Sequence, residues 1–152
     1  MRDSKDRVIL ASACLLGVAC RYNGTSRIHD NVISQLEGRR LVPVCPESLS
    51  GLPVPREPAE FDQGDGTTVK SGRTRIMMRD GTDVTREFMR GAAEARKIAR
   101  LVGAEEAILK DRSPSCGVHQ VYNQGKLVPG VGCFTAMLVE EGIKVRSEKD
   151  VE

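Results

Sequence analysis

The sequence has few aromatic residues, little net charge and no long apolar run. Aromatic side chains make up 3% of its 152 residues and tryptophan is absent, so aliphatic side chains must fill most of the core. The formal net charge of +2 excludes the strongly basic surface that is typical of nucleic-acid-binding proteins. The main apolar run, from Val8 to Cys20, is interrupted at Gly17 and is too short to cross a bilayer. We therefore expect a cytoplasmic protein with no membrane segment and no strong nucleic-acid footprint.

The sequence also lacks the cysteine and histidine patterns of secreted and zinc-binding proteins. Its five cysteines are an odd number and are spread along the chain without close pairs, which argues against a disulfide framework. The Cys-x2-Cys pair that usually marks structural zinc is missing. The two histidines, His29 and His119, have no partner at metal-ligand or catalytic-triad spacing. Reduced thiols in a cytosolic protein fit this pattern.

Alternating strand and helix patterns predict an α/β fold. The strongest helix covers 83–102, where apolar residues recur at helical spacing until Gly103. The other expected elements are strands at 8–13, 41–44, 107–110 and 143–145, helices at 30–37 and 132–141, a hairpin at 120–128, and an edge strand or hairpin at 69–79 turned by Asp80-Gly81. We predict that residues 1–152 form a single domain, with a Rossmann-like, mostly parallel sheet and helices on both faces.

A long segment from Cys45 to Gly66 is expected to be irregular. Its four prolines and three glycines exclude regular structure. Loops of this length are usually functional or disordered, and the apolar Leu52, Val54 and Phe61 indicate that this one packs against the domain. We expect it to lie over the carboxyl ends of the strands.

Three of the apolar runs that predict strands are each followed by a cysteine: Cys14 after 8–11, Cys45 after 41–44 and Cys116 after 107–110. The ligand crevice of an open α/β sheet lies beyond the carboxyl ends of its strands. We therefore expect the three thiols to converge there as one site. Each cysteine taken singly could be a small buried hydrophobe, but neighbours such as Glu47 and Ser113 have no use in packing and favour the shared site.

Three converging thiolates predict a soft metal ion or an iron–sulfur cluster. A [4Fe-4S] cluster normally has four thiolate ligands, so a three-cysteine site leaves one iron open to a substrate atom. Glu47, two residues after Cys45, would be an exposed loop carboxylate if taken alone, but beside a cluster it is the best-placed general base for activating a water molecule. Ser113 and Ser115 could orient this water or hold the substrate, with Ser113 preferred, or they could be turn-forming hydroxyls around Pro114.

The remaining candidates are polar side chains near the cysteines and two further thiols. The candidate substrate-binding residues are Arg21, Arg56, Lys110 and Ser115. For the basic residues among them, a solvated charge is an equally good interpretation. Cys133 begins an apolar helix and is expected in the core, whereas Cys20 could replace Cys14 as a ligand if its loop folds differently.

Several short motifs follow one another over nearly the whole chain: Ser12-Ala-Cys-Leu-Leu-Gly17, Cys20-Arg-Tyr-Asn-Gly24, Pro43-Val-Cys-Pro-Glu47, Gly51-Leu-Pro53, Pro55-Arg56, Pro58-Ala-Glu60, Asp83-Val-Thr85, Ser113-Pro-Ser-Cys-Gly117 and Ser147-Glu148. In this order they resemble the thiouracil desulfidase family of small bacterial and archaeal proteins. Three positions depart from the family pattern, because Asn23, Ser50 and Cys133 stand where Asp, Gly and Val are usual. None of these departures touches the three strand-end cysteines.

The resemblance implies a [4Fe-4S] cluster held by Cys14, Cys45 and Cys116, with Glu47 and Ser113 acting on water. The implied reaction is a hydrolytic, non-redox desulfuration of a thiolated pyrimidine, a nucleobase or nucleotide such as thiouracil, in which the sulfur binds the open iron and leaves as sulfide. The alternative is a non-catalytic iron–sulfur or metal carrier in sulfur metabolism, which has no use for Glu47. A third possibility is a metal-free thiol enzyme with Cys116 as nucleophile, but neither histidine is placed at the spacing of a Cys–His catalytic pair.

Overall fold

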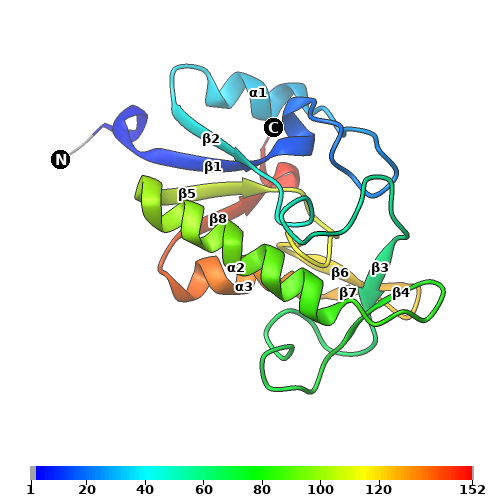
Figure 1. Ribbon diagram of the computed structural model, residues 1–152. Helices are drawn as coiled ribbons and strands as arrows, with labels where there is room; N and C mark the ends of the chain where they lie inside the picture. The colour runs from blue at the N-terminus through cyan, green and yellow to red at the C-terminus, as the bar shows by residue number, and fades with distance from the viewer. Residues whose placement is uncertain (1–2, 152) are drawn as a thin grey trace.

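In the computed structural model, which describes residues 3–151, the strands form two sheets (Figure 1). Within that range the first sheet has four parallel strands in the order β2-β1-β5-β8. These strands are β1 (Val8–Ser12), β2 (Arg40–Val44), β5 (Ala104–Leu109) and β8 (Lys144–Ser147), and the helices around them are α1 (Asp30–Leu36), α2 (Thr85–Val102) and α3 (Cys133–Glu140). The predicted α/β fold with a mostly parallel main sheet is confirmed.

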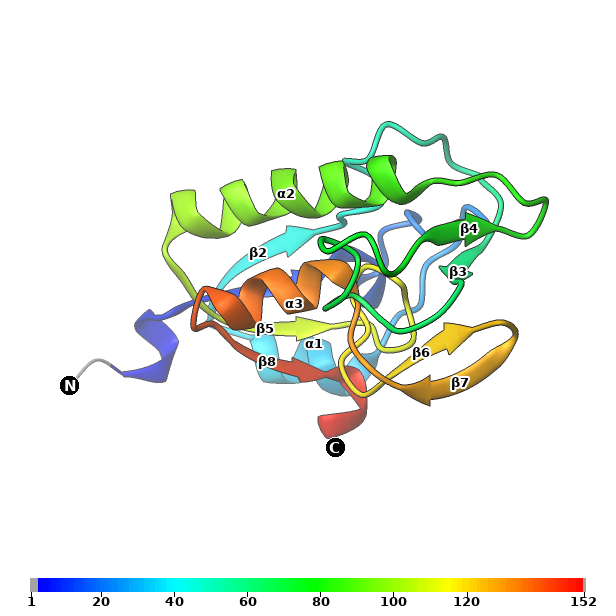
Figure 2. The ribbon, with the colours of Figure 1, turned by 90° about the horizontal axis from the view of Figure 1, so that it is seen from below.

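The parallel sheet separates two hydrophobic clusters, with α1 on one face and α2 and α3 on the other (Figures 1 and 2). Side chains alternate between the two faces of a strand. Accordingly, Leu10 of β1 and Leu109 of β5 belong to the α2 and α3 cluster, whereas Ile9, Ala11 and Ile108 belong to the α1 cluster. Because both faces are covered, β1 and β5 contain continuous apolar runs instead of an apolar–polar alternation.

Helix α2 follows the predicted apolar stripe closely. It begins at Thr85, whose N–H donates to the Asp83 Oδ1 atom at 2.9 Å, and it ends at Gly103, which takes the left-handed conformation with φ +65°. The side chains of the stripe that are buried in α2 are Phe88, Ala92, Ala95 and Ala99. The small alanines let α2 pack closely against α3 and the sheet.

The second sheet corrects the sequence-based prediction. Within residues 3–151 it has four strands in the order β4-β3-β6-β7: β3 (Ala59–Phe61), β4 (Ile76–Met78), β6 (Gln120–Asn123) and β7 (Lys126–Pro129). The predicted hairpin over 120–128 is confirmed as β6 and β7. The prediction of no regular structure over 45–66 is wrong at β3, and β4 is shorter than the 69–79 element expected. Three residues are too few to show the alternation of apolar and polar residues that predicts a strand. The pairing partners of β3 also lie far from it in the sequence, so no local pattern indicates them.

Strand β2 is an edge of the parallel sheet, and Pro43 is exposed in its middle. Proline has no N–H to donate, so it limits the pairing of a further strand on this edge.

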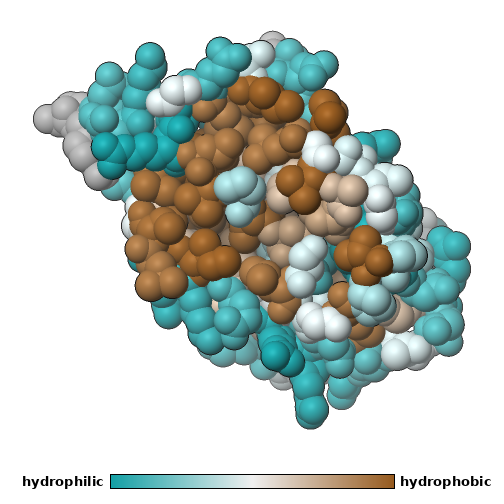
Figure 3. All heavy atoms as spheres, turned by 45° about the horizontal axis from the view of Figure 1, so that its top comes forward, coloured by the Kyte–Doolittle hydropathy of each residue, from teal (hydrophilic) through white to brown (hydrophobic). Residues whose placement is uncertain are grey.

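The face that carries β2 and α2 shows a broad area of hydrophobic side chains (Figure 3). Among the helices of residues 3–151, none is long and apolar enough to cross a membrane.

Candidate active site

A cavity of about 790 Å³ lies beyond the carboxyl ends of β1, β2 and β5. Its volume falls in the range that is usual for small-molecule sites. The thiol and polar side chains that line its inner part are Cys14, Cys20, Cys45, Cys116, Glu47 and Ser113. The structure therefore brings the three strand-end cysteines, the expected base and the expected serine to one place, and it adds Cys20.

Cys14, Cys20 and Cys45 form one side of the cavity. Cys14 lies in the short 3-10 helix η2 (Ala13–Leu16) that follows β1, and its carbonyl accepts the Arg27 N–H at 2.8 Å. Cys45 follows β2, accepts a hydrogen bond from Ser48 Oγ at 3.3 Å, and its sulfur lies 3.8 Å from the Cys20 carbonyl oxygen. Hydrogen bonding to the Cys14 thiol raises the pKa of Cys20, so the Cys20 thiol lies next to Cys14 as well as Cys45.

The loop that carries Cys116 is organised around one carboxylate. Asp111 is 1% exposed, and its Oδ1 atom accepts the N–H groups of four residues: Arg112 at 2.9 Å, Val118 at 2.9 Å, His119 at 3.0 Å and Gln120 at 3.3 Å. Burial favours the neutral acid, but these N–H donors outweigh it and lower the pKa of Asp111. The role of Asp111 was not predicted from the sequence, although an Asp two residues before a Ser-Pro-Ser-Cys-Gly turn is a signal for such a loop.

Ser113 links the Cys116 loop to Glu47. Its Oγ atom accepts the N–H groups of Ser115 at 3.0 Å and Cys116 at 3.1 Å, and it donates to Glu47 Oε2 at 3.1 Å. The hydroxyl is therefore used on both its acceptor and its donor sides. Ser113 is less free to reach a ligand than the sequence suggested, and it holds the Glu47 carboxylate instead.

Arg56 holds the other side of Glu47. The Arg56 side chain is 2% exposed, and its Nη2 atom lies 2.9 Å from Glu47 Oε1 and 3.1 Å from the Cys20 carbonyl oxygen. Arg56, which the sequence suggested as a substrate-binding residue, therefore hydrogen-bonds to other residues of the protein. This ion pair connects two residues that are nine positions apart in the irregular segment. Nothing in the local sequence pattern indicates it.

Two glycines set the positions of the cysteine loops, and the sequence analysis did not identify them. A Cβ atom on Gly91 of α2 would lie 2.1 Å from the Pro46 carbonyl oxygen, next to Cys45. A Cβ atom on Gly132, before α3, would lie 2.3 Å from the Ser115 carbonyl group, next to Cys116. Both helices can approach the site this closely only because these residues have no side chain.

The other expected substrate-binding residues differ in how well they are placed. Arg21 lines the cavity, with its guanidinium 5.6 Å from the centre of the Tyr22 ring. Lys110 also lines it, but its Nζ atom pairs with Glu148 Oε2 at 3.2 Å. Ser115 is 1% exposed and lies outside the set of residues that line the cavity within the described chain, so the structure does not favour a direct substrate contact there.

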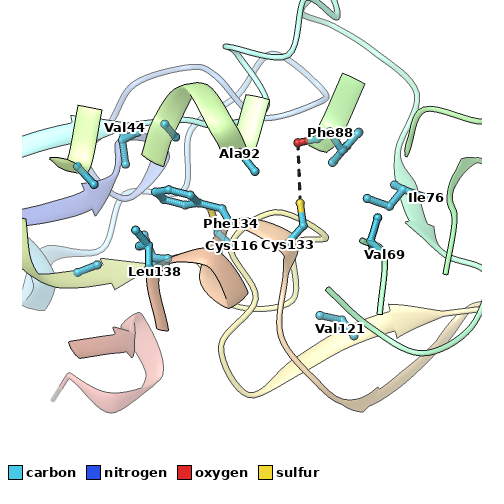
Figure 4. Close-up of a cluster of buried hydrophobic side chains, with 14 of the residues drawn as sticks. Val44, Val69, Ile76, Phe88, Ala92, Cys116, Val121, Cys133, Phe134 and Leu138 are labelled. Carbon is cyan, nitrogen blue, oxygen red and sulfur yellow. Dashed lines mark hydrogen bonds between the residues drawn. The ribbon is translucent and has the colours of Figure 1, made fainter. Parts of the chain in front are cut away.

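Cys133 is a core residue, as expected. It is 1% exposed at the start of α3, and its sulfur lies 3.9 Å from the Phe88 carbonyl oxygen of α2 (Figure 4). Burial raises the pKa of Cys133 to about 12. Cys116 belongs to the same cluster (Figure 4) and also lines the cavity, so this thiol borders both the core and the cavity.

The surroundings of Cys116 count against a metal-free thiol enzyme. Burial raises the pKa of Cys116 well above its ordinary value, and a buried neutral thiol is a poor nucleophile. Neither histidine lies among the described residues that line the cavity. His29 caps α1 by accepting the Val32 N–H at 3.3 Å, and His119 pairs with Asp150 at 2.8 Å.

The donor set fits an iron–sulfur cluster better than a single metal ion. Among residues 3–151, no group of three or more His, Cys, Asp or Glu side chains is arranged to hold one metal ion. Cys14, Cys45 and Cys116 line a common cavity from three loops, and soft thiolates are the ligands that such clusters use.

The outer part of the cavity comes from the second sheet, which the sequence analysis did not foresee. Its lining residues there include Phe61, Met77, Met78, Arg79, Tyr122 and Gln124. Apolar and aromatic side chains beside a few polar groups are typical of sites for planar organic ligands. The inner part therefore offers thiols and a carboxylate, and the outer part offers a wall for a small molecule.

Comparisons with known proteins point in one direction. A family model described as 2-thiouracil desulfurase matches residues 9–150. The uncharacterized protein YbbK of Bacillus subtilis is 40% identical over 147 residues, which cover 95% of this chain and 97% of YbbK. A solved structure, of the [4Fe-4S]-dependent thiouracil desulfidase TudS, is 41% identical, with a TM-score of 0.81 over 96% of this chain and 93% of TudS.

Proposed function

The chain belongs to the 2-thiouracil desulfurase family, and on that premise we propose how its cavity removes sulfur from a thiolated pyrimidine. The protein is an iron–sulfur-dependent thiouracil desulfidase. The overall reaction converts thiouracil and water to uracil and hydrogen sulfide, with no change in oxidation state. One observation carries the assignment of residues: the three strand-end cysteines line the same cavity as the hydrogen-bonded pair of Glu47 and Ser113.

We assign Cys14, Cys45 and Cys116 as the residues that hold the [4Fe-4S] cluster. When bound, the cluster supplies a Lewis-acidic iron, left open by the three-thiolate ligation, that attracts the thiocarbonyl sulfur. The three loops that carry these cysteines are each held by the protein: through the Cys14 carbonyl, the Ser48 hydroxyl and the Asp111 carboxylate. Such preorganisation keeps the ligands in place before metal arrives.

Glu47 acts as the general base on the attacking water. Its Oε1 atom is occupied by Arg56, whereas Oε2 accepts only the Ser113 hydroxyl among its hydrogen bonds within the described chain. A carboxylate oxygen has two acceptor sites, so Oε2 can take a further hydrogen bond from water and then the proton. Ser113 keeps the carboxylate facing the cavity and ties it to the Cys116 loop through the Cys116 N–H.

The rest of the cavity holds and orients the ring. Tyr122 and Met77 lie on its outer wall, where they can pack against a pyrimidine face, and Arg21 is a candidate for a hydrogen bond to the ring or its substituent. The cavity is roomy enough for a base that carries a sugar or phosphate, so we include thiolated nucleosides and nucleotides in the substrate class. We also propose that the chain works as one catalytic domain in the cytoplasm, where its five thiols stay reduced.

The test is anaerobic reconstitution of the protein with iron and sulfide, followed by iron counting and an assay of uracil and sulfide formed from 2-thiouracil. We expect about four irons per chain and turnover without added reductant. The Glu47→Gln variant should keep its iron and its absorption spectrum, because glutamine has nearly the same shape. It should lose roughly 10²- to 10⁴-fold in kcat, the usual contribution of a general base.

Two outcomes would reject this assignment in different ways. Iron-loaded wild-type protein that releases no sulfide from any thiolated pyrimidine would favour the carrier alternative. Full turnover by iron-loaded Glu47→Gln would keep the enzyme but remove Glu47 from its mechanism.

A further inference from the structure

The guanidinium of Arg56 makes a set of contacts that substrate binding does not explain. Its Nε and Nη2 atoms donate to Glu47 Oε1 at 3.3 and 2.9 Å. Nη2 also donates to the Cys20 carbonyl at 3.1 Å, and Nη1 donates to the Pro53 carbonyl at 3.4 Å. With its side chain 2% exposed, Arg56 is placed between the base, the Cys20 loop and its own loop.

The two carboxylate oxygens of Glu47 have different hydrogen-bond donors. Both hydrogen bonds from Arg56 go to Oε1, which fills the two acceptor sites of that atom. Oε2 receives the Ser113 hydroxyl at 3.1 Å and keeps one acceptor site. Without Arg56 the carboxylate could rotate about its terminal bond, since that torsion is soft, and either oxygen could then face the cavity.

We propose that Arg56 is a positioning residue that holds Glu47 Oε1, so that Oε2 is the oxygen presented to the attacking water. The same guanidinium ties Glu47 to the Cys20 carbonyl and thereby sets the distance between the base and the loop that carries Cys14 and Cys20. The inference rests on the proposed function, in which Glu47 is the base, and it replaces anion binding as the role of Arg56.

Lysine at position 56 should not substitute for arginine. An ammonium group keeps the positive charge, but it has no planar fork and cannot reach Glu47, the Cys20 carbonyl and the Pro53 carbonyl in one fixed geometry. The chain offers a matched control in Arg39, which forms a partly buried ion pair with Glu106 at the opposite end of the parallel sheet. Arg39→Lys makes the same chemical change away from the cavity.

The experiment measures iron per chain, the absorption spectrum, KM and kcat for Arg56→Lys, Arg39→Lys and wild type, with kcat expressed per loaded cluster. For Arg56→Lys we expect retained iron, a kcat about tenfold to a hundredfold lower, and a KM within about threefold of wild type. Arg39→Lys should match wild type in all four measured quantities. In the Glu47→Gln background, Arg56→Lys should cause no further loss, because a residue that acts through Glu47 has nothing left to position.

Three results would overturn the inference while leaving the proposed function in place. One is a raised KM with an unchanged kcat, which would make Arg56 a substrate-binding residue. Another is a kcat loss that multiplies with that of Glu47→Gln. The third is failure of both Arg56→Lys and Arg56→Gln to retain iron, which would make Arg56 a folding residue. Inactive, iron-loaded wild type would instead reject the proposed function, and this inference with it.

Discussion

The two ends of the parallel sheet both carry a partly buried arginine–glutamate pair, but the pairs lie in different surroundings. At the amino end, Arg39 before β2 pairs with Glu106 of β5, with side chains 11% and 16% exposed. At the carboxyl end, Arg56 pairs with Glu47, with side chains 2% and 16% exposed. The first pair joins two strands of the sheet. The second lies in a cavity beside four thiols.

The difference shows that two ion pairs of the same chemistry can lie in unlike surroundings, one between segments of the sheet and the other beside thiols in a cavity. Glu106 and Glu105 of β5 pair at the amino end with Arg39 and Arg7, which directly precede β2 and β1. Glu47 has Arg56 on Oε1, whereas among the described residues Oε2 accepts a hydrogen bond only from Ser113. The comparison predicts that changes at the carboxyl end affect function first, whereas changes at the amino end affect only stability.

The largest effect should come from the Cys45→Ala variant. Removing one of three thiolates leaves too few ligands for the cluster, so we expect loss of bound iron and of all cluster-dependent turnover. Iron counting and the visible absorption spectrum after anaerobic reconstitution measure this. The Cys133→Ala variant is the control, because it removes a thiol from the core and not from the cavity; it should keep its iron. Iron retained in Cys45→Ala would contradict the ligand assignment.

The Gly91→Ala variant should come next. Helix propensity alone predicts a gain of about 1 kcal/mol from this change. Because the new Cβ atom would lie 2.1 Å from the Pro46 carbonyl oxygen, we expect instead a loss of about 1–3 kcal/mol and a displaced Cys45 loop with less bound iron. Urea unfolding and iron counting test it, with Leu101→Ala on the exposed side of α2 as a near-neutral control. A stabilised Gly91→Ala protein would show that the helix and the loop are not in tight contact.

The Asp111→Asn variant should lose about 2 kcal/mol of unfolding free energy at pH 7, because four N–H groups would face a neutral amide oxygen. The folded state lowers the pKa of Asp111 from its ordinary value of 3.8. Its stabilising contribution is therefore complete above that value and is lost as the pH falls through the lower folded pKa. Urea unfolding of cluster-free protein from about pH 4.5 down to about pH 2 should show the gap between wild type and variant closing. A gap that stays constant would rule out the charge as its cause.

The smallest effect should come from Arg39→Lys at the amino end. The ammonium group keeps the charge but loses the fork geometry, so we expect a cost of about 1 kcal/mol in unfolding free energy. Iron content, kcat and KM should equal those of wild type, measured on the same preparations. A drop in turnover here would erase the contrast between the two ends of the sheet.

Much of the site could be predicted from the sequence because it depends on strand ends. Parallel strands finish at the same edge of a sheet, so cysteines that follow three apolar runs had to approach one another, and Glu47 had to follow Cys45 into the same place. The prediction needed only the local pattern of each run and the general geometry of α/β folds. The hairpin over 120–128 and the long helix were predictable for the same local reasons.

Other parts of the site could not be predicted, because they depend on distances between separate loops. The role of Arg56 is set by where a proline-rich loop returns, and its local sequence is equally compatible with an exposed charge. The need for glycine at position 91 follows from how closely α2 approaches Pro46. β3 and β4 have too few residues to show a period, so the second sheet and the outer wall of the cavity emerged only from pairing across the chain.

By itself the sequence determined the class of fold, the thiols at the ends of the strands and, through its motifs, the family. Those features depend on short stretches of sequence, so hydrophobic periodicity and residue chemistry are enough to predict them. The tertiary structure alone decided which oxygen of Glu47 Arg56 binds, how the Ser113 hydroxyl is hydrogen-bonded, and which residues of the second sheet line the cavity. Each of these depends on hydrogen bonds between residues far apart in the chain, whose geometry exists only once the two sheets and their loops have packed together.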